Sequence, residues 1–272
     1  MRLAFAFLLG VSMFAEPASP APQAAPSATL TWTDVADLAI ASPVIVRATA
    51  RRVAPLSRRL APDLPPGEIR VLMEADLVDV LKASGILPAR ARWLWQGPAG
   101  PRGRPPFAAG DELILFLVRE AGPGGGPGAD YRLANAAGQL RWTDALEREV
   151  RTILSEVRRP DAPAAIRAIA NGFHVPGTVA GESESQFFLV TEDGRPMTLV
   201  VLRRPGAEPV VRLATGDLID DSAVEIVRDT LVWRALACTM PGELPPALAA
   251  DPGLRADFAE MRRRIGACNR TL

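Results

Sequence analysis

The chain has 272 residues and no net charge, because 31 basic side chains are matched by 31 acidic ones. Nucleic-acid binding normally needs an excess of Lys and Arg to neutralise phosphates, so this balance argues against a nucleic-acid partner. One histidine, His174, and two cysteines, Cys238 and Cys268, are too few for the common zinc centres, which use four cysteines, two cysteines with two histidines, or three histidines. The composition therefore predicts no resident metal or other cofactor.

The N-terminus has the pattern of an export signal. Arg2 precedes an uninterrupted run of apolar and small residues over 3–15, which is shorter than the roughly 20 residues of a membrane-spanning helix. Residues 1–15 are therefore predicted to be a signal peptide; an uncleaved short anchor is the alternative. Residues 16–29 are rich in Ala and Pro and predict a disordered linker. No later segment reaches spanning length, so we expect a soluble mature chain in the periplasm or secreted, without a membrane span.

Residues 30–143 show the alternation typical of half-buried strands. Thr33 is expected to cap a short helix over 34–41. The predicted strands cover 44–53, 69–77, 90–96 and 113–118, followed by a hairpin of 131–133 with 139–142. Alternation places Trp93 and Trp95 on one face, where core packing is expected; exposed tryptophans on a barrel would instead indicate ligand stacking. Six short strands separated by turn signals predict a small all-β barrel.

Three segments in this region carry a resemblance to a known family. They are ASPVIVRATARRV, LVDVLKA and AAGDELILFL. In this order they resemble the OB-fold barrels of the netrin-like, or tissue inhibitor of metalloproteinases-like, class over about residues 35–142. The inhibitors of that class chelate a target zinc through an N-terminal cysteine. This chain has no cysteine before Cys238, so the resemblance implies the barrel architecture and not the inhibitory mechanism.

The second half predicts a helical bridge and a mixed module. Thr143 is expected to cap a helix over 144–158, and a short helix over 164–170 completes a bridge spanning 144–172. In 173–272, strands over 186–191 and 197–203 flank the turn at Asp193–Gly194, and both their faces are apolar, which favours a sheet covered on both sides. The remaining predicted elements are a strand over 210–214, a helix or buried strand over 230–238 with the helix favoured, and a helix from Pro252, capped by Asp251, to Gly266. The fold class is thus α+β: an OB-like barrel, a bridge, and a module with an antiparallel sheet.

Two cysteines in an exported chain predict one disulfide, Cys238–Cys268. It would close a loop of about 30 residues and stabilise the fold by roughly 3.6 kcal/mol on the chain-entropy model. The alternative is a pair of separate buried thiols. No Cys-x-x-Cys motif is present that would indicate a redox-active pair.

Residues 181–185 (GESES) approach the Gly-x-Ser-x-Gly nucleophile-elbow motif of hydrolases, with Ser183 as nucleophile. The final glycine is missing, Glu182 and Glu184 flank the serine, and the only possible histidine base, His174, precedes it in the chain. A lone histidine at a strand edge is more often a hydrogen-bonded structural residue. Acidic side chains at 182 and 184, or at 217, 220 and 221, could bind Ca²⁺, but no EF-hand spacing is present and a solvated turn is favoured.

No catalytic constellation stands out against these alternatives. The sequence therefore favours an exported cell-envelope protein that binds or scaffolds an envelope protein or ligand without catalysing a reaction. The alternative is a hydrolase whose site around Ser183 and His174 is assembled only in three dimensions.

Overall fold

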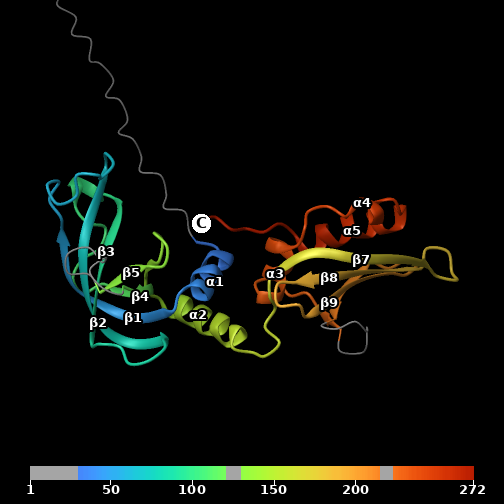
Figure 1. The fold of residues 1–272 in the computed structure, drawn as a ribbon, viewed down its shortest axis with the longest axis horizontal. Helices are drawn as coiled ribbons and strands as arrows, with labels where there is room; N and C mark the ends of the chain where they lie inside the picture. Colours follow the sequence, from blue (N-terminus) through green and yellow to red (C-terminus); the bar gives the residue numbers. More distant parts are fainter. Residues whose placement is uncertain (1–29, 121–129, 215–222) are drawn as a thin grey trace, which may run out of the picture.

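The computed structural model describes residues 30–120, 130–214 and 223–272. The predicted signal peptide, the Ala/Pro linker, the Gly/Pro stretch at 122–128 and the acidic residues at 217, 220 and 221 lie outside the described residues. The chain is an α+β fold in which a β-barrel and a separate antiparallel sheet lie on either side of two helices (Figure 1).

The first module is a closed five-stranded barrel. Its strands, with one additional short strand, are β1 (Val44–Pro55), β2 (Glu68–Lys82), β3 (Arg90–Pro98), β4 (Glu112–Arg119), β5 (Tyr131–Leu133) and β6 (Gln139–Arg141). The order β1-β2-β3-β5-β4 is closed by pairing of β4 with β1. A short 3₁₀ turn, η1 (Pro101–Gly103), lies in the connection to β4. This barrel is consistent with the OB-like architecture expected from the sequence.

Alternation along the strands produces the barrel core, and bulges in β1 bend the strand so that it reaches both neighbours. Trp93 is fully buried inside the barrel and Trp95 is 8% exposed, so the prediction that both pack in the core is confirmed. The inward-facing residues come from alternate positions of four strands: Val44, Val46, Ala48, Ala50, Val71, Met73, Ala75, Ala91, Trp93, Trp95, Leu113, Leu115 and Leu117.

Two helices cover the outer side of β1 and β4. They are α1 (Trp32–Ala41) and α2 (Asp144–Val157). Ile114 and Phe116 of β4 point outward and pack against them, which explains why this strand is apolar without alternation. Helix α1 begins earlier than expected because Thr31, rather than Thr33, caps it: the Thr31 hydroxyl accepts from the Asp34 N–H, and the Asp34 carboxylate accepts from the Thr31 N–H.

The expected hairpin between residues 131–133 and 139–142 is wrong. Strands β5 and β6 do not pair with each other; both pair with β4. Because β1 occupies the opposite edge of β4, β5 and β6 follow one another along the same edge. The Asn135–Gly138 turn is therefore an interruption in one extended segment. This arrangement leaves β6 beside the end of β3 without pairing to it.

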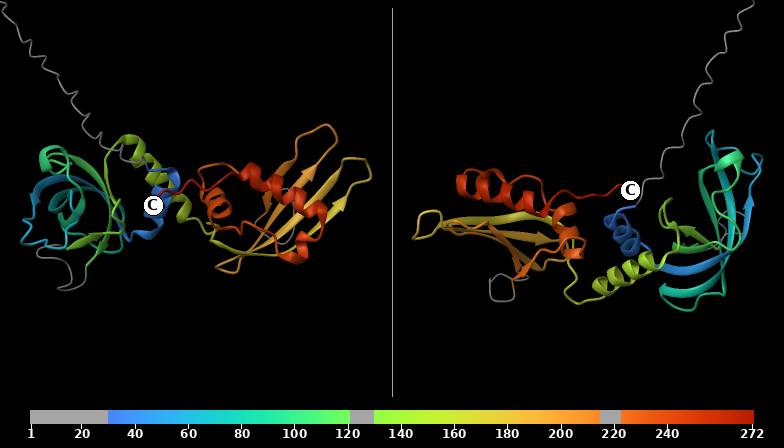
Figure 2. Two further views of the ribbon diagram at one scale, coloured as in Figure 1. Left: turned by 90° about the horizontal axis from the view of Figure 1, so that it is seen from above. Right: turned by 180° about the vertical axis from the view of Figure 1, so that it is seen from behind.

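The second module is an antiparallel sheet of strands in the order β11-β10-β9-β8-β7. The strands are β7 (Ile166–Pro176), β8 (Ser183–Thr191), β9 (Pro196–Arg203), β10 (Val210–Ala214) and β11 (Val224–Glu225), and the helices are α3 (Leu231–Thr239), α4 (Pro246–Ala249) and α5 (Pro252–Ile265). The hairpin around Asp193–Gly194, the third strand and both longer helices are confirmed. The helices lie on one face of the sheet (Figure 2). On the other face Thr198 and Val200 are buried but Val190 is 38% exposed, so the expected cover on both sides is only partly present.

The expected helix over 164–170 is also wrong, because residues from Ile166 onward form β7. The helical spacing of Ile166 and Ile169 arises from a bulge between them. Pairing with β8 skips the residue after Ile166, so Ile166 opposes Thr191 and Ile169 opposes Leu189. Both isoleucines therefore face the core although they are three positions apart. The bridge between the modules is thus the single helix α2 and the short segment that follows it.

Candidate functional site

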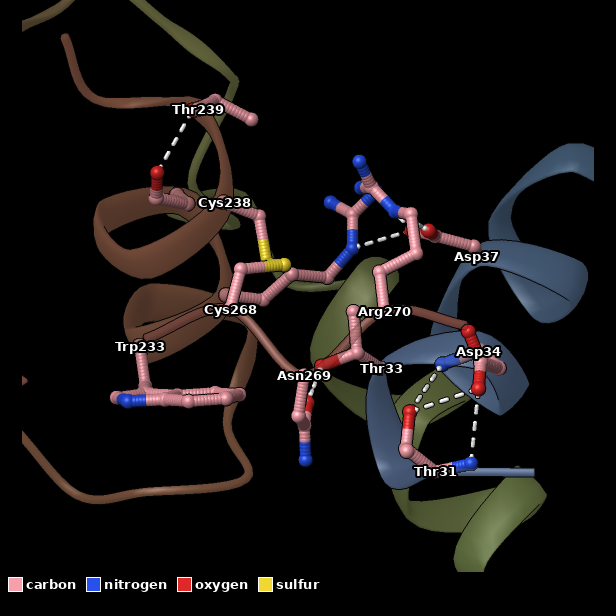
Figure 3. Close-up of a disulfide and its surroundings, with 12 residues drawn as sticks. Thr31, Thr33, Asp34, Asp37, Trp233, Cys238, Thr239, Cys268, Asn269 and Arg270 are labelled. Atoms are coloured by element: carbon pink, nitrogen blue, oxygen red, sulfur yellow. Dashed lines mark hydrogen bonds and ion pairs between the residues drawn. A yellow bond between two sulfur atoms is a disulfide. The ribbon is translucent and has the colours of Figure 1, made fainter. Parts of the chain in front are cut away.

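Cys238 and Cys268 lie at disulfide distance (Figure 3). Their Cα atoms are 4.8 Å apart and 30 positions separate them in the sequence. Cys238 is near the end of α3, and Cys268 follows α5, whose last residue is succeeded by Gly266 at a φ of 79°. The bond joins the segment that follows α5 to helix α3.

Beyond Cys268 the chain crosses to the barrel module and binds along α1 (Figure 3). We call residues 268–272 the strap. Its contacts are the hydrogen bonds Thr33–Asn269 (2.7 Å), Arg270–Asp37 (2.5 Å) and Thr271–Asp34 (2.7 and 2.8 Å). Arg234 of α3 also pairs with Asp37. The strap and α3 together hold the two modules side by side.

Asp34 is the central residue of this contact. Its side chain is fully buried, and its oxygens accept hydrogen bonds from Thr31 and from the backbone N–H of Thr271 and Leu272. Burial by itself raises the pKa of the Asp34 carboxyl, but the hydrogen bonds from Thr271 and Thr31 outweigh it and bring the pKa well below its ordinary value. The carboxylate is therefore ionised at any ordinary pH.

The predicted base His174 belongs to a polar cluster between the sheet and α5. His174 Nδ1 lies 2.9 Å from Ser185 Oγ, and Ser185 donates to Asp257 over 2.6 Å. Arg203 Nε donates to the other oxygen of Asp257 over 2.5 Å. Because the Ser185 proton goes to Asp257, its oxygen accepts from His174, which places the histidine proton on Nδ1.

This cluster has the residue types of a catalytic triad but not its arrangement. A nucleophilic serine is activated by the histidine and must reach a substrate. Here Ser185 is fully buried and donates to Asp257, which is 1% exposed. The geometry instead ties α5, which carries Asp257, to β7, β8 and β9.

The other predicted residues do not join His174. Ser183 pairs in the sheet with Pro176, and Glu184 accepts a hydrogen bond from Gln186 Nε2 over 2.6 Å. Glu182, Ser183 and Glu184 line a separate shallow hollow of about 440 Å³ at the end of the sheet. The structure therefore brings His174 together with Ser185, Asp257 and Arg203, which the sequence pattern did not single out.

Gly253 of α5 lies against the imidazole ring of His174. A Cβ at position 253 would lie 2.4 Å from Cδ2 of the imidazole. Gly253→Ala is expected to destabilise the protein by about 2 kcal/mol, because the ring must move away from Ser185 or α5 must shift. Urea denaturation measures the change. Gly242→Ala is the matched control, since Gly242 is exposed with no atom near its Cβ position; equal stability of the two variants would contradict the prediction.

A larger hollow opens in the barrel wall. It has a volume of about 960 Å³ and lies between the end of β3 and β6. Trp95 and Phe107 form its aromatic part, with ring centroids 5.5 Å apart, and the Arg141 guanidinium lies 5.5 Å from the centre of the Phe107 ring. Gly97 lets the Trp95 indole lie against the β3 backbone, because a Cβ there would be 2.7 Å from the ring.

Gln139 of β6 lines this hollow and is 5% exposed. Its Oε1 accepts from Trp93 Nε1 over 2.7 Å. An indole N–H can only donate, so this bond fixes the orientation of the amide. The amide Nε2 is buried, and no described residue accepts a hydrogen bond from it. A buried donor of this kind costs free energy until an acceptor reaches it. Nothing in the local sequence around Gln139 signals this role.

Within the described residues, no three His, Cys, Asp or Glu side chains lie close enough to hold a metal ion. None of the helices formed by the described residues has the length and apolar character needed to cross a membrane. No protein-family model matches the chain, and no curated protein is significantly similar to it.

Proposed function

We propose that this chain is an exported, non-catalytic binding protein of the cell envelope, and that the hollow between β3 and β6 receives its ligand. The observation that carries the proposal is the buried Gln139 amide, whose Nε2 donor has no acceptor among the described residues. Binding sites are typically concave, mostly apolar and equipped with a few placed polar groups. Trp95, Phe107 and Gln139 supply that combination here.

Export is supported by the signal-like N-terminus together with the Cys238–Cys268 pair, because disulfides persist in oxidising compartments. The resemblance to the netrin-like class belongs to the same proposal: the barrel would serve as a recognition module, without zinc chelation by an N-terminal cysteine. A hydrolase centred on Ser183 and His174 has less support, because the serine bonded to His174 is the buried Ser185.

Tryptophan indole signals provide the test. The chain has five tryptophans, so a ¹⁵N-labelled mature protein gives five indole N–H resonances. Adding size fractions of an envelope extract is expected to shift the signals of Trp93 and Trp95 but not that of Trp233, which is buried in the second module. Ala137→Arg, which places a long side chain in the hollow, should abolish the shifts.

Ala207→Arg is the control, because Ala207 is exposed in the turn after β9. The proposal fails if no fraction shifts the Trp95 signal, or if the protein turns over ester substrates and loses that activity in a His174→Ala variant. Cell fractionation tests export separately: a cytoplasmic protein that retains residues 1–15 would contradict it.

A further inference from the structure

The second half of β3 has an unpaired edge. This strand pairs with β2 along its length but with β5 only at Trp93. The Ala99 N–H donates to the Gly67 carbonyl, and antiparallel bonding alternates, so the odd-numbered residues of β3 bond to β2. Gln96 therefore directs its backbone N–H and C=O away from β2, toward the hollow that it lines.

Strand β6 presents a second unpaired edge on the other side of the hollow. The Phe116 N–H donates to the Gly138 carbonyl, so the even-numbered residues of this segment bond to β4. The backbone N–H and C=O groups of Gln139 and Arg141 consequently face away from β4. Among the described strands, none pairs with β6 on this side. Two strand edges thus border one hollow, and neither is covered by a strand.

Of the two charged side chains that line the hollow, Arg141 is paired within the protein, and Glu68 is hydrogen-bonded to a neutral amide. Arg141 pairs with Asp111 over 3.0 Å, and Glu68 accepts from Gln96 Nε2 over 2.8 Å. Backbone bonding at the two edges needs no charge on the partner, so a segment without net charge should bind with little dependence on salt. What the hollow offers is backbone hydrogen bonding at its edges, aromatic surface from Trp95, and the Gln139 Nε2 donor at its inner wall.

We infer that the hollow takes a short extended peptide of a partner protein, which adds a strand between β3 and β6. This inference rests on the proposed binding function and names the class of partner. The three residues of β6 span about 10 Å at the rise of a strand, so the inserted segment is about three to four residues long. One inward-facing residue supplies an oxygen to Gln139 Nε2, as Ser, Thr, Asn or Asp would. Main-chain bonds to a sheet edge are an established mode of peptide recognition.

The test uses a phage-displayed library of random heptapeptides, selected against the full mature chain. We expect selection of peptides with apolar residues around one oxygen-bearing side chain, whose affinity changes little between low and high salt. Methylating a central backbone N of a selected peptide should weaken binding at least about tenfold, because each central N–H is needed for pairing. Trp95 indole shifts on binding place the peptide in the hollow.

Two variants test the protein side. Gln139→Glu keeps an acceptor for Trp93 but replaces the Nε2 donor, and Arg141→Pro removes an edge N–H that is not bonded to β4. Each is expected to weaken peptide binding at least about tenfold. Glu184→Gln, in the hollow of the other module, is the control and should bind normally.

The outcomes separate the two claims. If selected peptides bind the Arg141→Pro variant unchanged, tolerate N-methylation, or shift only signals of the second module, strand addition is wrong. If no peptide binds but a non-peptide component of the extract shifts Trp95 and competes at the hollow, the inference fails and the proposed binding function stands. If neither peptides nor extract components perturb Trp95, both fail.

Discussion

Reduction of the Cys238–Cys268 disulfide is expected to lower the free energy of unfolding by about 3.6 kcal/mol. The bond closes a loop of 30 positions, and in the chain-entropy model its main effect is to restrict the unfolded chain. Urea denaturation followed by tryptophan fluorescence, with and without reductant, measures the difference. The effect should be largest for the second module, since α3 and the segment after α5 are the elements that the bond joins.

The double variant Cys238→Ser, Cys268→Ser is the control for this experiment. Its stability should match that of the reduced protein and should not respond to reductant. Identical unfolding curves for the oxidised and reduced wild-type protein would show that the two sulfurs contribute nothing as a bond. That result would also remove one of the two supports for export.

Replacement of Asp257 by Ala is expected to destabilise the protein by about 3 kcal/mol. Asp257 is 1% exposed and accepts hydrogen bonds from Ser185 and Arg203. Without the carboxylate, the Ser185 hydroxyl and the Arg203 guanidinium lose their acceptor. The cost of leaving these donors unsatisfied accounts for most of the expected loss of stability. Denaturation of the variant, compared with the wild-type protein under the same conditions, measures the loss.

Two further variants separate this cause from a general effect of mutation. Ser185→Ala removes one hydrogen bond and should cost about 1 kcal/mol. Glu184→Ala, on the opposite face of the same strand, should change stability by less than about 0.5 kcal/mol. If Asp257→Ala leaves stability intact while abolishing a hydrolytic activity, the cluster is catalytic and its structural role is refuted.

Periodicity predicted those elements whose burial follows from local pattern. The alternation of β1 to β3 matched the two faces of the barrel wall, and the stripe of α5 matched its packing on the sheet. The same reasoning failed at Ile166 and Ile169, because bulges give a strand the spacing of a helix. A bulge depends on the pairing partner, and the partner strand is not visible in a local window of sequence.

The candidate sites were predicted less completely than the fold. Residue types alone indicated Ser183 and His174, whereas the serine bonded to His174 is two positions further along the strand and faces the helix that carries Asp257. Gln139 had no signal at all. Its role depends on β5 and β6 sharing one edge of β4, which is a long-range arrangement. This arrangement brings the Gln139 amide to Trp93, and it also leaves the end of β3 without a partner strand on one side.

The strap has a mechanical consequence. The Asp34 carboxylate binds both Thr31, which caps α1, and Thr271 of the strap, so one side chain joins the two ends of the described chain. Tension applied between these two points is carried first by the hydrogen bonds at Asp34 and only afterwards by the barrel or the sheet. Under tension the strap should therefore detach from α1 while both modules are still folded, and the disulfide limits how far the detached segment can move.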